Sequence, residues 1–201
     1  MPGSLSTPTK DRPYHHGDLR GALILEAISQ VEAVGMEHLS LRSVAHEVGV
    51  SPSAAYHHFV DKDALIAAVA LEGVAQLNLS LATAMTRYPR GEAASAQKRA
   101  SAAGLAYITF AVEHPNLFRI AFSGHCPRPP EREKNPLIVE LFDDLVATGA
   151  LPADLREGSE EVMWAAVHGM ATLVLEGMFA VEEVPHCLAA LERMMRLRPS
   201  P

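Results

Sequence analysis

The chain has 201 residues, of which 48% are hydrophobic, and a formal net charge of −7 at pH 7. This composition can form one or two cores, and no uninterrupted apolar run is long enough to cross a bilayer. The first residues lack the apolar middle region of a secretory signal, so we expect a cytoplasmic protein. The net negative charge argues against a protein that coats nucleic acid without sequence preference. Two cysteines are too few for a disulfide framework.

Helical spacing of apolar residues dominates the N-terminal part. Three segments, at 19–34, 41–48 and 52–59, each follow a residue that can cap a helix N-terminus. Glycines stand where the first two should end. Proline is suited to the first turn of the third, because the N–H that it lacks would be unpaired there anyway. The caps are Asp18, Ser40 and Ser51 with Pro52, and the stops are Gly35 and Gly49.

The rest of the chain also has helical periodicity. No segment alternates apolar and polar residues as a half-buried strand would, so the sequence predicts an all-α fold of about nine helices. A loop at 123–136 with four prolines and a charge cluster interrupts the pattern. The further helices are expected at 62–85, 92–114, 115–122, 136–148, 153–180 and 184–197.

Two short helices joined by the tight turn Gly49-Val50-Ser51 have the layout of a helix-turn-helix, whose second helix can enter a major groove. Ala55 and Phe59 of that helix are four residues apart and can face the core. Serine can bond either base type, and tyrosine and histidine can donate to phosphates. A helical corner with a polar surface is the alternative interpretation. The residues left for the outer surface are Ser53, Ala54, Tyr56, His57 and His58.

The histidine pair His57-His58 could also indicate a metal site. Adjacent helical residues point about 100° apart, so such a pair rarely chelates one ion. We therefore expect no metal, and nothing in the sequence implies a cofactor. The chain has no nucleophile elbow, phosphate-cradling glycine loop or helical His-x-x-x-His, so we expect no enzymatic activity.

The stretch YHHGDLRGALILEAISQVEAVGMEHLSLRSVAHEVGVSPSAAYHHFVDKDALIAAV resembles the N-terminal domain of tetracycline-repressor (TetR) family regulators without a gap. The resemblance implies a flexible tail at 1–13, a three-helix DNA-binding domain at 14–70, and a helical ligand-binding and dimerisation bundle at 71–201. It implies that Arg42 contacts the DNA backbone and that Ser51, Pro52, Ser53 and Ala54 face bases or sugars. It also implies that Tyr56, His57, His58 and Lys62 hold phosphates.

Farther along, Trp164, His168 and Gly169 are similar to the Trp-x-x-x-His-Gly signature of one TetR subgroup. Gly169 lies mid-helix, where we expect it to allow a close helix crossing. His168 is either a core histidine bonded to a neighbour or a polar anchor for a ligand. The other candidates form plain core or line an apolar pocket, and plain core is the commoner role of aromatic and methionine residues at this spacing. The candidate ligand-binding residues are Phe110, Phe118, Phe122, Met163, Trp164 and His168.

The last two helices are apolar on more than one face, which is typical of surface buried against a second subunit. We expect a two-fold homodimer that places two recognition helices about one DNA turn apart on a palindromic operator. The leading hypothesis is a transcriptional repressor released from double-stranded DNA by a small, apolar effector. The alternative is a helical protein that binds a hydrophobic ligand and whose helix-turn-helix no longer reads DNA. The excess of acidic residues in the first seventy favours that alternative.

Overall fold

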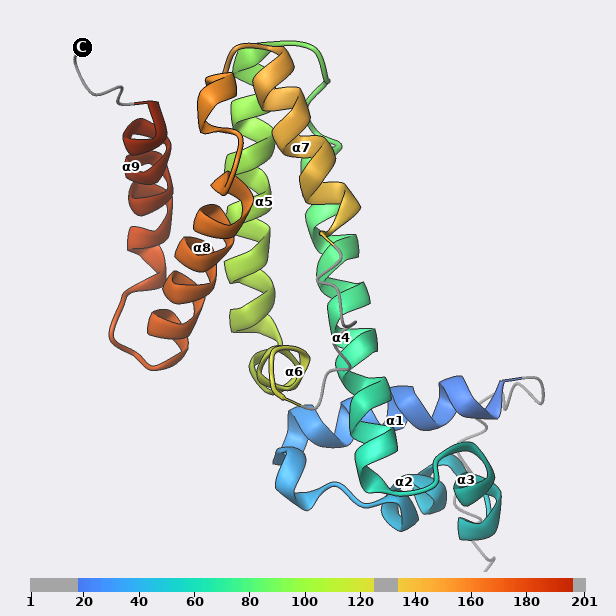
Figure 1. The fold of residues 1–201 in the computed structure, drawn as a ribbon. Coiled ribbons are helices and arrows are strands. Elements are labelled where there is room, and N and C mark those ends of the chain that lie inside the picture. Colours follow the sequence, from blue (N-terminus) through green and yellow to red (C-terminus); the bar gives the residue numbers. More distant parts are fainter. Residues whose placement is uncertain (1–17, 125–133, 197–201) are drawn as a thin grey trace, which may run out of the picture.

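The computed structural model describes residues 18–124 and 134–196 (Figure 1). Within these ranges it contains nine α-helices, three short 3₁₀ turns and no strand, which confirms the expected all-α fold. The tail expected at 1–13 lies outside the described residues. The helices are α1 (Leu19–Val34), α2 (Leu41–Val48), α3 (Pro52–His58), α4 (Lys62–Met85), α5 (Ala93–Glu113), α6 (Pro115–Ala121), α7 (Pro136–Ala147), α8 (Ser159–Leu175) and α9 (Val184–Arg196).

Side-chain caps start the N-terminal helices where the sequence predicts. Asp18 Oδ1 accepts a hydrogen bond from the backbone N–H of Gly21 at 2.8 Å. Ser40 Oγ accepts one from the backbone N–H of Ser43 at 3.0 Å. Gly49 has φ 82° and ψ 28°, the left-handed conformation that glycine adopts without steric cost. The chain can therefore end α2 and begin α3 within a very short turn.

The first three helices and the start of α4 close around one end of the hydrophobic core. α1 packs on α2 and α4, and α2 packs on α3. Ala55 is fully buried and Phe59 is 3% exposed, so α3 turns inward the face that the sequence predicts. The opposite face of α3 is left on the outside of the molecule. The other core residues here are Leu23, Ala27, Val31, Val44, Ala45, Leu65 and Val69.

α4 is one helix of 24 residues that runs from the N-terminal helices into the C-terminal half (Figure 1). The expected domain boundary after Ala70 therefore falls inside a continuous helix. By length and mean hydropathy alone α4 could cross a membrane, although we expected no such segment. In this fold its inner face packs against α1, α5 and α6. Central helices of globular domains have the same apolar character.

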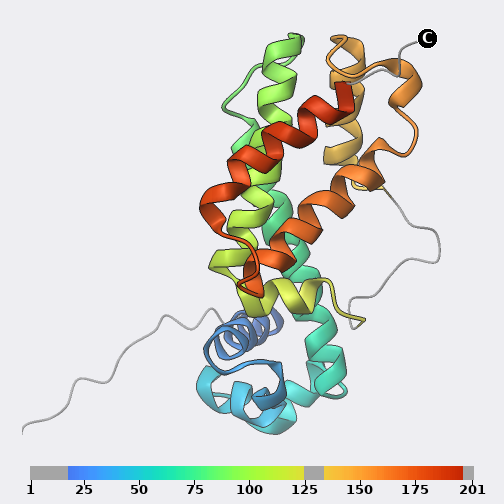
Figure 2. The ribbon, with the colours of Figure 1, turned by 90° about the vertical axis from the view of Figure 1, so that its left-hand side faces the viewer.

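The C-terminal half is built around α5. α5 lies alongside α4, and α7, α8 and α9 pack against it (Figures 1 and 2). The prediction of a single helix at 153–180 is wrong. Gly158, with φ 77°, separates a 3₁₀ turn at Ala153–Leu155 from α8. Residues with a Cβ rarely adopt this φ, so the glycine interrupts a pattern that periodicity alone extends.

Glycine allows close helix crossings, but at other positions than expected. A Cβ placed on Gly169 would meet no atom within 4 Å, so α8 makes no close crossing there within one protomer. A Cβ on Gly104 of α5 would lie 3.0 Å from Leu188 Cδ2 of α9. A Cβ on Gly73 of α4 would lie 2.9 Å from Leu117 Cδ1 of α6. The tight crossings therefore join α4 to α6 and α5 to α9.

α6 joins the two halves of the molecule, because it packs against α1, α4 and α5. Asn116 Nδ2 donates to the backbone carbonyl of Val31 at 3.1 Å. Glu32 Oε1 accepts a hydrogen bond from the backbone N–H of Leu117 at 2.9 Å. The first turn of α6 is thus bonded to the last turns of α1, and the Gly73 crossing fixes it against α4.

We expect Gly73→Val to lower the free energy of unfolding by about 1–3 kcal/mol, because the added methyl groups overpack the crossing with Leu117. Ala75→Val places the same side chain on the exposed side of the same helix, where it meets no packed helix and only the lower helix propensity of valine relative to alanine acts. Urea unfolding of both variants measures the difference. A Gly73→Val variant that is as stable as the unaltered protein would contradict the tight α4–α6 crossing.

Candidate functional site

The outer face of α3 carries most of the side chains expected to contact DNA. Ser53, Tyr56, His57 and His58 are exposed, and Ala54 is partly buried. Tyr56 is 46% exposed despite its large ring. The polar side chains are therefore held outward by the burial of Ala55 and Phe59 on the opposite face, which is the arrangement that a groove-reading helix requires.

Three further predicted DNA contacts flank this face. Ser51 Oγ accepts a hydrogen bond from the backbone N–H of Ala54 at 3.2 Å, so its hydroxyl already serves as the N-cap of α3. Arg42 is exposed on α2, and Pro52 is exposed at the start of α3. All three lie on or next to the turn between α2 and α3.

Lys62, at the start of α4, is placed differently. Its Nζ donates to the backbone carbonyl of Glu37 at 3.2 Å, in the 3₁₀ turn Met36–His38 between α1 and α2. The ammonium group thus holds the start of α4 against this turn. It would have to exchange this partner for a phosphate oxygen to contact DNA.

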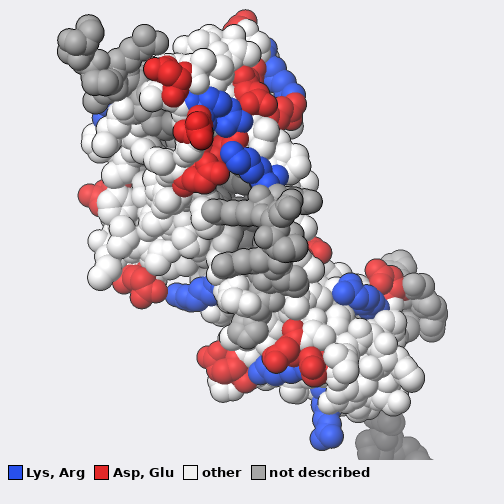
Figure 3. All heavy atoms as spheres, viewed as in Figure 1, with Lys and Arg blue, Asp and Glu red and all other residues white. Residues whose placement is uncertain are grey.

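The surface around the helix-turn-helix is not strongly basic. Figure 3 shows acidic and basic side chains interleaved over this part of the molecule, without a continuous basic patch on the face in view. His46 Nδ1 lies 3.2 Å from the Glu47 carboxylate on the exposed side of α2. Among the described residues, no group of three or more His, Cys, Asp or Glu side chains could hold a metal ion.

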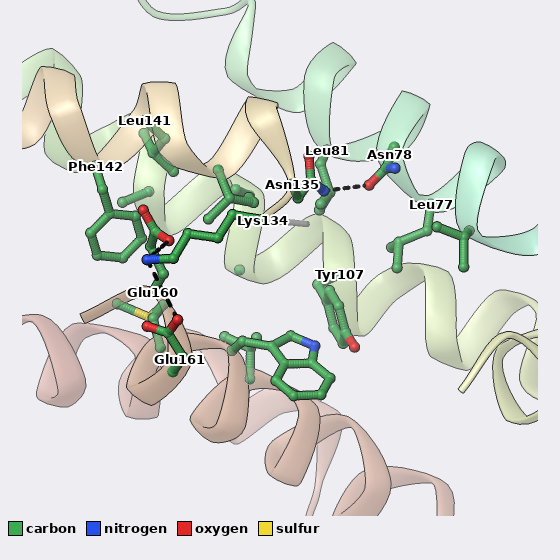
Figure 4. Close-up of a pocket in the computed structure, with 18 of the residues that line it drawn as sticks. Leu77, Asn78, Leu81, Tyr107, Lys134, Asn135, Leu141, Phe142, Glu160 and Glu161 are labelled. Carbon is green, nitrogen blue, oxygen red and sulfur yellow. Dashed lines mark hydrogen bonds and ion pairs between the residues drawn. The ribbon is translucent and has the colours of Figure 1, made fainter. Parts of the chain in front are cut away.

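A second candidate site is a cavity of about 380 Å³ between α4, α5, α7 and α8 (Figure 4). Its volume lies at the lower end of the range typical of small-molecule sites. Most of its wall is apolar and comes from helices far apart in the sequence. The apolar and aromatic lining includes Val74, Leu77, Leu81, Tyr107, Ile138, Leu141, Phe142 and Val167.

Two groups of polar side chains belong to the wall of this cavity. Asn135 Nδ2 donates to Asn78 Oδ1 at 2.8 Å, which links the start of α7 to α4. Lys134 Nζ lies 2.9 Å from Glu160 Oε2 and 3.5 Å from Glu161 Oε1 (Figure 4). The two glutamates occupy the first turn of α8, where the helix dipole also stabilises a negative charge.

The predicted ligand residues fall into two groups. Phe122, Met163 and Trp164 line the cavity. Phe110 and Phe118 are buried outside its wall, at 4% and 3% exposure. Helical spacing alone cannot separate these two groups, because the residues of both groups are apolar.

His168 lies one layer behind the wall of the cavity. Its Nδ1 is 2.9 Å from the hydroxyl of Tyr107, which does line the cavity. The imidazole stacks on Phe118 with ring centroids 5.5 Å apart and also contacts Phe122 and Trp164. Burial lowers the pKa of His168 and raises that of Tyr107. A neutral His168 therefore supports the aromatic wall through Tyr107.

Periodicity does not reveal several cavity residues. Lys134 and Asn135 border a proline-rich loop, and Glu160 and Glu161 lie inside a segment that we expected to be one unbroken helix. Their convergence depends on α7 and α8 meeting in space. The only local signal was the pair of acidic residues that follows Gly158 and Ser159, because acidic residues are typical of a helix first turn.

Two family sequence models match separate parts of the chain. Residues 23–69 match the family described as bacterial regulatory proteins, tetR family. Residues 100–197 match the tetracyclin repressor-like C-terminal domain. Neither match bears on the Trp-x-x-x-His-Gly subgroup, which stays a prediction.

Solved structures resemble the whole chain. A protein of unknown function from Rhodococcus sp. RHA1 is 31% identical with a TM-score of 0.75, and the match covers 93% of this chain and 100% of that one. A TetR variant from Acinetobacter baumannii AYE in complex with minocycline is 19% identical with a TM-score of 0.55, covering 89% and 98%. A TetR family transcription regulator from Marinobacter aquaeolei VT8 is 16% identical with a TM-score of 0.54, covering 87% and 93%.

The last two likenesses show the fold alone, whereas the two sequence models together span most of the chain. The first model covers the helix-turn-helix, and the second covers the part of the chain that supplies most of the cavity wall. The chain therefore belongs to the TetR family of ligand-responsive transcriptional regulators.

Proposed function

We propose that the protein is a homodimeric repressor that binds a palindromic operator and is released by a small-molecule effector. The observation that carries this proposal is α4, which begins in the helix-turn-helix and lines the cavity farther along. TetR-family regulators are generally non-enzymatic DNA-binding proteins, and we propose that this one likewise has no enzymatic activity and acts in the cytoplasm.

For DNA binding, we propose that α3 enters the major groove with Ser53 and Ala54 closest to the bases. Their short side chains allow a close approach but offer few hydrogen bonds, so DNA shape supplies part of the selectivity. The groups proposed to contact phosphate, sugar or the neighbouring base edges are Arg42, Ser51, Pro52, Tyr56, His57, His58 and Lys62. The sparse positive charge predicts modest non-specific binding.

For dimerisation, we propose the side of the molecule formed by α8 and α9 (Figures 1 and 2). Large apolar side chains are exposed there to an extent that is unusual for a monomer surface. Two-fold pairing of this surface would bury them and set two α3 helices side by side for a palindrome. The exposed residues are Val162 (59%), Leu173 (43%), Met178 (77%) and Met194 (67%).

For release, the effector must bind the DNA-bound and the free conformation with different affinities. A ligand with equal affinity for both conformations would not shift the equilibrium between them. A ligand in the cavity would contact Val74 and Leu77 of α4 and Phe122, which directly follows α6. A shift of α4 or α6 would reach α1 through Asn116 and Leu117. That a protein of this fold has been solved with minocycline supports small-molecule binding.

The excess of acidic over basic residues in the first seventy favours one alternative, a ligand-binding protein whose helix-turn-helix no longer reads DNA. Tyr56→Ala separates the two functions. Under both, the variant keeps its ligand affinity, but only a repressor would lose regulation of a reporter placed behind the promoter of its own gene.

We expect Arg42→Ala to weaken operator binding about tenfold and to lower the slope of log affinity against log salt by about one, because one phosphate contact is lost. Footprinting of the promoter region beside its own gene defines the operator, and titrations at several salt concentrations give the slope. The control is Arg87→Ala. Arg87 is exposed just beyond the far end of α4, roughly 35 Å from Lys62 at the helical rise per residue. No protected site at low salt would contradict the DNA-binding function.

We expect Leu173→Glu to convert the dimer into a monomer, because it places a charge in the proposed apolar interface. Sedimentation velocity measures the change. Leu25→Glu makes the same substitution at a 61% exposed position on α1 and should leave the dimer intact. A dimer that survives Leu173→Glu would place the interface elsewhere.

A further inference from the structure

Resting on the function proposed above, we propose that the effector is an uncharged apolar molecule with a carbonyl oxygen that accepts a hydrogen bond from the side-chain amide of Asn78. Asn78 lies on α4 and belongs to the cavity wall, most of which is apolar (Figure 4). A small ketone, ester or amide combines the apolar body and the acceptor that this wall favours.

The orientation of the Asn78 amide is the first reason. Asn135 is the N-cap of α7, and its Oδ1 accepts a hydrogen bond from the backbone N–H of Leu137 at 3.1 Å. The Nδ2 of Asn135 therefore faces Asn78 and lies 2.8 Å from its Oδ1 (Figure 4). Since the oxygen and nitrogen of an amide are told apart by their partners, this contact occupies the oxygen of Asn78 and leaves both of its N–H groups for other acceptors.

The unused donor is the second reason. Among the residues that the structure describes, none accepts a hydrogen bond from Asn78 Nδ2. Asn78 is only partly buried, so water can reach this group until a ligand fills the cavity. A ligand that covers the donor without bonding it loses affinity, whereas a ligand with an acceptor at this point restores the bond.

The other polar groups of the described wall are the third reason. The hydroxyl of Tyr107 lies 2.9 Å from His168 Nδ1, so it already has a hydrogen-bond partner. Lys134 Nζ lies 2.9 Å from the Glu160 carboxylate and 3.5 Å from that of Glu161. A charged ligand would have to separate these ion pairs or lie against the apolar wall without a counter-ion, and both are costly. An uncharged ligand avoids both costs.

The position of Asn78 also connects this bond to DNA binding. Asn78 follows Val74 by one turn on the helix that begins in the helix-turn-helix. A ligand bonded to Asn78 therefore acts on α4 directly and, through Asn135, on the start of α7.

Four probes that share a 2-phenylethyl body test the proposal at pH 7 against the full chain. The readout is the fluorescence of Trp164, which lines the cavity and is the only tryptophan of the chain. The probes are 4-phenylbutan-2-one, its methylene isostere 2-methyl-4-phenylbut-1-ene, 3-phenylpropanoate and 4-phenylbutan-2-amine. We expect the ketone to bind about tenfold more tightly than the carboxylate and the amine, because only these two lose the hydration of a charge. Tightest binding of either ion, or no saturable signal with the ketone, would overturn the proposal.

The ratio of ketone affinity to isostere affinity then locates the carbonyl group. Asn78→Asp keeps an acceptor for Asn135 but removes both N–H donors, so we expect the ratio to fall about fivefold, as the loss of one neutral hydrogen bond predicts. Gln97→Glu makes the same change from amide to carboxylate at a partly buried position of α5 outside the described cavity wall, and it should keep the ratio. The same ratio in Asn78→Asp as in the unaltered protein would contradict the proposal.

Asn78→Leu repeats the measurement without adding a charge. We expect the ratio to fall to the same extent, and because both affinities are measured on one variant, a general change in the cavity affects them alike. Circular dichroism must show that both variants are folded. A ratio that falls in Asn78→Asp but not in Asn78→Leu would assign the effect to the new charge and refute the hydrogen bond.

Operator binding without any probe is measured in parallel by gel mobility shift. Operator binding together with a ratio that Asn78→Asp leaves unchanged refutes the ligand class and leaves the repressor function intact. Ketone binding that depends on Asn78, without operator binding, refutes the repressor function and leaves the ligand class intact.

Discussion

The contact of α6 with α1 and α4 is the constraint on which the arrangement of the molecule depends. α6 is only a short helix, yet its first turn is hydrogen-bonded to the end of α1 and its Leu117 packs where α4 has a glycine. A side chain at that glycine would separate the helices. The helix-turn-helix and the C-terminal half are therefore held together by one tight crossing as well as by the continuity of α4.

This constraint gives the cavity a mechanical connection to the reading surface. The cavity wall includes α4 and the residue that follows α6, so both elements that hold α1 lie within reach of a bound ligand. Packed helices move between discrete arrangements more readily than they deform. A small displacement at the cavity can thus be transmitted as a rigid shift of the N-terminal helices.

The two candidate sites differ in the burial of their polar and ionised groups. On the outer face of α3, exposed polar side chains surround the small residues Ser53 and Ala54, and we propose that DNA shape contributes more to selectivity there than positive charge does. In the cavity, a few ionised groups are partly or fully buried, where each one has a larger energetic effect.

Local chemistry determined the start and end of the N-terminal helices, because capping by Asp18, Ser40 and Ser51 and the left-handed Gly49 involve only neighbouring residues. The family resemblance, and with it the class of function, also rested on contiguous residues. The tertiary structure alone decided that His168 bonds to Tyr107 and that Lys134 meets Glu160. These pairs are distant in sequence, and helical periodicity reports which face of a helix is apolar but not which other helix covers it.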